Sequence, residues 1–315
     1  MKKILLSGLI VFWFTQGMAQ YSVSLKMNLE KNKVYRLQSV SEQTVSQTVN
    51  GNQQNVDLKV DYSLSVKMID ATADFIVTEI HFDTLMTNTN SMGKIVSISS
   101  AVEGDIKSSE TSGVLSCIMN RLSKSALYVK MDFTGKPIEI INSKMLPSLI
   151  LKDTGSITLT GPVSVAVKTQ IANMINDNNL KTMIGGFTWR LPDKQVSPGD
   201  EWNITQQIGS GGMDLEIITR YHLIGIQGNK ANISSESNIR AAANAAPIQS
   251  GGATIVYDNL KGMSKSTMVI DSRTGLIIEE DAKSHIFGSL AISAPGVNMQ
   301  MPMDINGESR IRSLQ

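Results

Sequence analysis

The sequence predicts a mainly β protein made of two antiparallel, strongly curved sheets or half-barrels of long strands, joined by a helical connector. The segment from Val56 to Met68 alternates apolar and polar residues without a break. This period of two is typical of an antiparallel strand with one face in solvent. The strand would be roughly 40 Å long at about 3.3 Å per residue, which favours a large, coiled sheet. A change to helical spacing between residues 143 and 186 separates two β regions.

The first nineteen residues have the layout of a secretory signal peptide. Lys2 and Lys3 precede an apolar stretch from Ile4 to Phe14, and residues 17 to 19 form a small-x-small cleavage sequence. The apolar stretch is too short to span roughly 30 Å of hydrocarbon. We therefore expect export with cleavage before Gln20, a periplasmic or extracellular location, and no transmembrane span in the mature chain.

Residues 20 to 142 are predicted to form a first antiparallel β lobe. Tyr21 to Met27 alternates and predicts a first strand, and Val34 to Val49 predicts a second. Asn50-Gly51 is a strong hairpin signal, because both residues tolerate positive φ. This turn leads into the long alternating strand, and Phe75 to Thr84 is expected to return beside it.

The remainder of this lobe is less regular. We expect a short strand from Lys94 to Ile98 and a flexible connection from Glu103 to Ser112, after which strand resumes. Residues 132 to 135 predict a turn between two strands. The single cysteine, Cys117, lies among apolar residues and is expected to be a buried core residue.

Residues 143 to 186 are predicted to form the helical connector. Val167, Ile171, Met174 and Ile175 recur at helical spacing, so we expect one or two helices that cover a sheet. Residues 187 to 315 are predicted to form a second antiparallel β lobe.

The second lobe ends in two long predicted strands. They run from Ser284 to Ser293 and from Val297 to Leu314, and a Pro295-Gly296 turn joins them. Met268 to Glu279 repeats the pattern of Val129 to Glu139, with strand, Asp, turn, Gly, strand and Glu in the same order. Whether the two lobes are a true duplication is left open by the different spacing of their Asp and Gly residues.

Charge and composition exclude several classes of partner. The chain has 29 basic and 28 acidic residues and no basic cluster, so nucleic acid is not expected to bind. Its three histidines are scattered, without a second His or Cys at metal-ligand spacing. No cofactor and no catalytic residue is predicted.

Several landmarks suggest a family. Tyr35, the Asn50-Gly51 hairpin, Val196 to Trp202 and the turn from Asp271 to Gly275 resemble the exported Bacteroidetes proteins of domain-of-unknown-function family 6263. The resemblance covers most of the mature chain. Where a turn glycine is expected near Tyr35 this chain has Asn32, which also tolerates the left-handed region. The resemblance implies an exported location and this architecture, and it implies no activity.

One methionine-rich segment has the composition of a metal site. Met299, Met301 and Met303 alternate on a predicted strand, so their thioethers would share one face, and soft sulfur ligands suit Cu(I). The alternative is that methionine fills the apolar face of the sheet. The 17 methionines spread along the chain favour that alternative.

A wide sheet with one apolar face must have that face covered. Our first hypothesis is a non-enzymatic envelope protein that binds an apolar, lipid-like ligand or a protein partner in the concavity of the sheet. The residues predicted to face such a ligand are Leu58, Val60, Tyr62, Leu64 and Val66.

Two further function classes stay open. A structural envelope protein would have a sheet interior packed entirely by its own side chains. A hydrolase acting on glycans or lipids would bring two carboxylates, or a Ser and a His, together in one cleft.

Overall fold

The computed structural model describes residues 22–49, 51–210, 213–243, 245, 247–250, 253–294 and 296–314. All thirteen strands in these residues belong to one antiparallel sheet. In chain order they are β1 (Val34–Val49), β2 (Asn52–Ala71), β3 (Ile76–Ser91), β4 (Lys94–Ser99), β5 (Leu127–Met131), β6 (Pro137–Ile140), β7 (Glu201–Ser210), β8 (Met213–Gln227), β9 (Lys230–Ala241), β10 (Ile248–Ser250), β11 (Ala253–Asp271), β12 (Ile277–Ala294) and β13 (Val297–Leu314). Across the sheet the order is β6-β5-β3-β2-β1-β13-β12-β11-β9-β8-β7, with β4 beside β3 and β10 beside β11.

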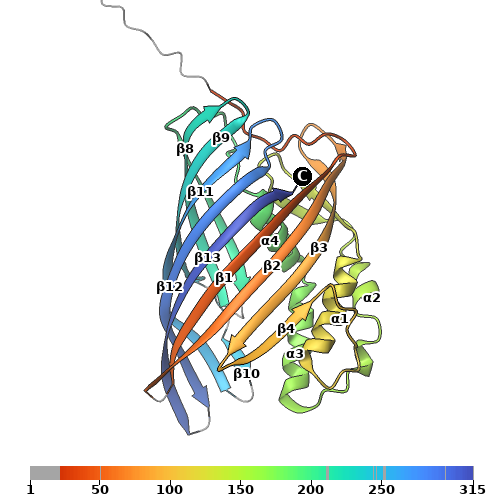
Figure 1. Ribbon diagram of the computed structural model, residues 1–315, viewed down its shortest axis with the longest axis vertical. Coiled ribbons are helices and arrows are strands. Elements are labelled where there is room, and N and C mark those ends of the chain that lie inside the picture. The colour runs from red at the N-terminus through yellow and green to blue at the C-terminus, as the bar shows by residue number, and fades with distance from the viewer. Residues whose placement is uncertain are drawn as a thin grey trace, which may run out of the picture.

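The helices lie between the two edges of this sheet and along one side of it (Figure 1). They are α1 (Thr111–Ser123), α2 (Leu146–Ile150), α3 (Gly161–Met174) and α4 (Asp177–Thr188), with a short 3₁₀ helix at Thr154–Ser156. α1 packs against β3 and β4, whereas α4 contacts both edge strands, β6 and β7. Because the two edges meet the same helix, the sheet must bend around α4, and the face toward α4 is the concave one.

The prediction of two sheets is wrong, because β1 pairs with β13. Their register runs from Arg36 opposite Leu314 to Gln47 opposite Met303 and joins the two halves in one sheet. Periodicity defines a strand and its faces, but it holds no information on which distant strand becomes its neighbour. The mainly β composition, the long strands and the helices of the connecting region are confirmed.

Local turn predictions agree with the structure where it describes them. Gly51 has a φ of +78° at the β1–β2 turn, as the hairpin requires. Asn50, Pro295 and the predicted signal peptide lie outside the described residues.

The sequence prediction is wrong for residues 111–123, where a connection followed by strand was expected. The chain forms α1 there, because Val114, Ile118 and Leu122 recur at helical spacing and are fully buried. Cys117 is buried on this helix, as expected.

The predicted N-terminal strand is also wrong in part. In the described residues, the segment 22–31 is extended and makes only two isolated bridges, Val23 with Val196 and Lys31 with Met68. Its other backbone hydrogen bonds go to turns: the Met27 N–H donates to the Phe133 carbonyl at 2.8 Å. The segment therefore ties the turns of distant hairpins together instead of extending the sheet.

Two apolar clusters lie on the concave face. Cluster A fills the space between the sheet and the helices, and its members include Leu25, Met27, Leu37, Leu64, Leu180, Ile184, Phe187, Ile233, Met268 and Ile311. Cluster B consists of Leu215, Ile239, Leu260, Leu290, Met301, Met303 and Ile305.

The end of α4 docks on the β5–β6 turn at Gly135. The Thr188 hydroxyl donates to the Gly135 carbonyl at 2.7 Å, and Gly135 has a φ of +84°. A Cβ added at Gly135 would lie 2.1 Å from the Thr188 carbonyl oxygen. This position therefore needs glycine both for its backbone angle and for space.

We predict that Gly135→Ala lowers the free energy of unfolding by about 3 kcal/mol or more, because strain and overlap add. Gly228→Ala is the matched control, since Gly228 has a φ of +59° and an added Cβ would meet nothing within 4 Å. We expect this control to lose only about 1 kcal/mol. Urea unfolding measures both values, and equal losses would contradict the close approach of α4 to the turn.

Candidate functional site

A band of small and polar residues separates clusters A and B on the concave face. On β11 the inward positions run from Met268 of cluster A through Ser266 and Ser264 to Gly262 and then Leu260 of cluster B. The same change occurs on β1, β8, β9, β12 and β13. We call this band the serine belt, and it consists of Ser41, Gln43, Thr219, Ser235, Ser237, Ser264, Ser266, Ala282, Ser284, Gly307 and Ser309.

The strand register places the belt residues in two rows across the sheet. One row is Ser41, Ser309, Ala282, Ser266 and Ser235, and the other is Gln43, Gly307, Ser284, Ser264, Ser237 and Thr219. The Ser235 and Ser266 hydroxyls hydrogen-bond at 2.8 Å, and Thr219 and Ser237 do so at 2.9 Å. These bonds offset part of the free energy lost when hydroxyls leave water.

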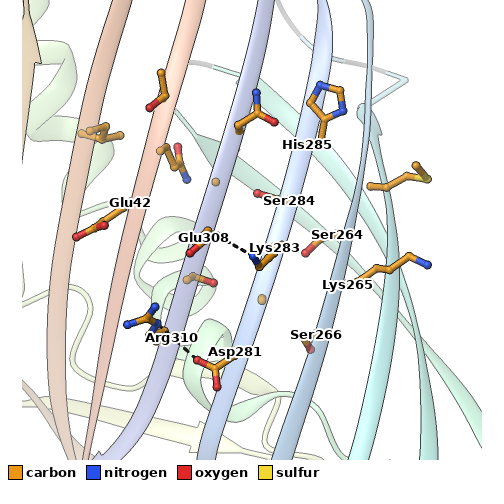
Figure 2. Close-up of a pocket in the computed structure, with 18 of the residues that line it drawn as sticks. Glu42, Ser264, Lys265, Ser266, Asp281, Lys283, Ser284, His285, Glu308 and Arg310 are labelled. Carbon is orange, nitrogen blue, oxygen red and sulfur yellow. Dashed lines mark ion pairs between the residues drawn. The ribbon is translucent and has the colours of Figure 1, made fainter.

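A cavity of about 1720 Å³ lies along the middle of these strands. Its lining includes belt residues such as Ser264, Ser284 and Gly307 together with charged residues that alternate with them. Figure 2 shows these side chains on neighbouring strands, with Lys283 paired to Glu308. Because the belt side chains are small, they leave space that larger apolar side chains fill on either side of the belt.

The opposite face of the same strands carries exposed ion pairs. Lys59 pairs with Glu42 at 2.7 Å, Lys283 with Glu308 at 2.9 Å and Lys265 with Glu236 at 2.8 Å. In each pair the hydrogen bond from the lysine lowers the pKa of the carboxyl group. Solvent screens these charges, so the ion pairs contribute little to the stability of the fold and mainly keep this face hydrated.

One ion pair at the edge of the belt is buried. Arg190 contacts Glu280 on β12 with Nε 3.0 Å from Oε2, and their side chains are only 12% and 10% exposed. The Trp202 indole N–H donates to the Arg190 carbonyl at 2.9 Å. Trp202 also stacks on Tyr221 at 5.5 Å between ring centroids, and both rings belong to cluster A, so the ion pair lies at the border of that cluster.

The five predicted ligand-facing residues do share the concave face of β2. Leu64 and Val66 are fully buried in cluster A, where other side chains already cover them. Leu58 lines the cavity, and Leu58 and Val60 lie opposite the belt residues Gln43 and Ser41. Tyr62 is half-buried beside cluster A, and burial raises its pKa. Contact with a ligand therefore stays a prediction. The positions of Leu58, Val60 and Tyr62 are compatible with it.

The three predicted metal-ligand methionines share one face of β13. Met301 and Met303 are 8% and 6% exposed within cluster B, and Met299 is half-buried opposite Ile292. Their placement fits the packing of an apolar face, and Cu(I) binding stays a prediction. Within the described residues, no three His, Cys, Asp or Glu side chains gather as a metal-binding group.

The belt and the buried ion pair were not identified from the sequence. The belt does leave a signal, because Ser264 and Ser266 stand at positions where the alternation otherwise places apolar residues. The ion pair leaves none, since Arg190 and Glu280 are far apart in the chain and only the fold brings them together.

Two of the three histidines, His222 and His285, line the cavity together with belt residues. His81, His222 and His285 alternate with buried or inward residues of β3, β8 and β12, so they stand on the opposite face from the belt serines. Within the described ranges, we find no helix with the length and apolar character needed to cross a membrane.

Burial raises the pKa of Tyr221 to about 12. The folded protein therefore holds this proton more tightly than the unfolded chain, whose tyrosines have a pKa near 10. The stability that follows is fully present below about pH 10 and is lost as the pH rises through about 12.

We predict that the free energy of unfolding of the wild type falls between pH 9 and pH 11.5 as Tyr221 becomes able to ionise. In Tyr221→Phe this fall should be about 2 kcal/mol smaller. Urea unfolding at the two pH values measures this difference. The same loss in both proteins would show that Tyr221 is not protected from ionisation.

Several solved structures match most of this chain, all at very low sequence identity. A lipovitellin structure matches 91% of this chain at 9% identity with a TM-score of 0.49, and this chain spans 25% of the lipovitellin chain. An outer membrane channel from Pseudomonas putida F1 matches 91% of this chain and 97% of its own at 7% identity, with a TM-score of 0.25. A DUF1329 family protein from Desulfovibrio piger matches 86% and 83% of the two chains at 8% identity, with a TM-score of 0.14. With TM-scores below 0.5, these likenesses carry no argument about function.

The sequence itself places the chain in a family. No curated protein matches it. The model of a family of unknown function (DUF6263) matches residues 74–277, which is well over half of the chain. The chain therefore belongs to the DUF6263 family, as its turns and aromatic residues suggested.

Proposed function

We propose that this chain is a non-enzymatic protein of the cell envelope that binds a lipid-like ligand on the concave face of its sheet, at cluster B. The position of cluster B is the observation that supports this proposal. Cluster B is built from β8, β9, β11, β12 and β13, whereas the helices pack mainly against β3, β4, β6 and β7. Side chains of the strands therefore cover cluster B, and several of these covering side chains are only half-buried themselves.

The side chains around cluster B retain access to solvent. Val45, Ile217 and Ile286 are half-buried against the cluster on its concave side. The residues of cluster B itself are only 3% to 8% exposed, so the accessible apolar surface belongs to the half-buried side chains around it. A ligand that removed about 200 Å² of such apolar surface from water would gain about 5 kcal/mol.

The chemistry of this region favours binding over catalysis. Met301 and Met303 supply flexible, polarizable side chains that adapt to ligands of different shape. The serines of the belt stand on the opposite face of the sheet from all three histidines, so no histidine is placed to activate them.

Two neighbouring residues of β12 allow a matched test. Ile286 is half-buried on the concave side, and Phe287 is exposed on the opposite face. We predict that Ile286→Asn weakens binding of a fluorescent long-chain hydrocarbon probe without a charged head group about tenfold, because one apolar contact is replaced by a polar one. We expect Phe287→Asn to change binding less than about twofold.

Fluorescence titration measures the affinity, and circular dichroism with thermal unfolding checks that both variants fold. An uncharged photoactivatable long-chain probe, with its labelling sites mapped by mass spectrometry, should label residues 286–292 and 299–305. Labelling confined to the charged face, or no binding of any apolar probe, would contradict the proposed function.

A further inference from the structure

We infer that the ligand is amphipathic, with an uncharged, hydrogen-bonding polar group that lies at the serine belt and an apolar chain that lies along cluster B. This inference rests on the proposed function, because it places the ligand on the same concave face. It adds the chemical class of the ligand and the residues that select it.

The first observation is the order of the residues along the strands. On β13 the inward positions run from Ser309 and Gly307 of the belt to Ile305, Met303 and Met301 of cluster B. From Ser309 to Met301 the strand extends roughly 26 Å at about 3.3 Å per residue. One surface therefore changes from polar to apolar over the length of an extended lipid molecule.

The second observation is the hydrogen-bonding capacity of the belt. Ser264, Ser284 and Ser309 are half-buried and line the cavity. A hydroxyl can donate one hydrogen bond and accept two, so even the bonded pair Ser235 and Ser266 keeps lone pairs that can accept more. Hydroxyl, ester and amide groups match such surroundings because they also donate or accept without a formal charge.

The third observation is the placement of charge. Lys265, Lys283 and Arg310 are among the residues that line the cavity. Each of them is already paired with a carboxylate, Lys265 with Glu236, Lys283 with Glu308 and Arg310 with Asp281. On the concave side, the positive charge of Arg190 is compensated by Glu280. A carboxylate or phosphate at the belt would leave water and would have to compete with these carboxylates for a counter-ion, which disfavours a charged head group.

The test compares three probes that share a long hydrocarbon chain. Monooleoylglycerol has a neutral hydroxylated head group, oleate is anionic at pH 8, and octadecene has no head group. Each competes with a fluorescent apolar probe bound to the full chain. We expect monooleoylglycerol to displace the probe at about tenfold lower concentration than oleate or octadecene. This difference corresponds to one or two additional hydrogen bonds.

The double variant Ser264→Ala with Ser284→Ala removes two belt hydroxyls without adding bulk. We expect it to reduce the preference for monooleoylglycerol over octadecene to less than about threefold, while octadecene itself binds as before. Ser289→Ala with Ser293→Ala is the matched control, because it removes two hydroxyls of β12 that alternate with the inward Leu290 and Ile292 and that do not line the cavity. This control should keep the full preference.

The possible results separate the two proposals. If all three probes bind equally well and the serine variant changes nothing, the head-group inference is overturned and apolar binding remains. Tighter binding of oleate than of monooleoylglycerol also overturns it, since the belt would then select a charge. If no probe binds to the folded wild-type protein, the proposed function fails and the inference fails with it.

Discussion

The pairing of β1 with β13 is the constraint on which the rest of the structure depends. It joins strands from opposite ends of the chain and makes one sheet out of two halves. A slip of one residue would turn Met301 and Met303 to the charged face and bring Gln300 and Pro302 inward. The register of this one pair therefore keeps both apolar clusters and the belt continuous across the sheet.

The parts of the fold that could be predicted from the sequence are those that local chemistry decides. Alternation gave the long strands and their faces, and the positive φ of Gly51 follows from the hairpin turn that it forms. The neighbour of β1 could not be predicted, because many alternating strands in this chain would pair equally well. α1 was missed because serine and glycine near Thr111 outweighed the helical spacing of its buried residues.

For the candidate site, the sequence could predict only which face of the strand its residues share. The alternation of β2 correctly put Leu58 and Leu64 on the same side, but it could not show that helices and neighbouring strands cover Leu64 and leave Leu58 at the cavity. The belt was overlooked because a serine on a strand is normally counted as solvent-exposed. Its inward position becomes evident only when rows from six strands are aligned by their register.

The extended N-terminal segment gives this architecture a particular folding order. Its backbone N–H groups at Met27 and Asn28 donate to Phe133 and Thr274, in turns that belong to different halves of the chain. During synthesis both this segment and β1 are complete long before these partners and β13 exist. Until then β1 has an unpaired edge, which is a template for aggregation, and closing such long loops is slow. The nascent chain therefore carries an open sheet edge until its last strand is available.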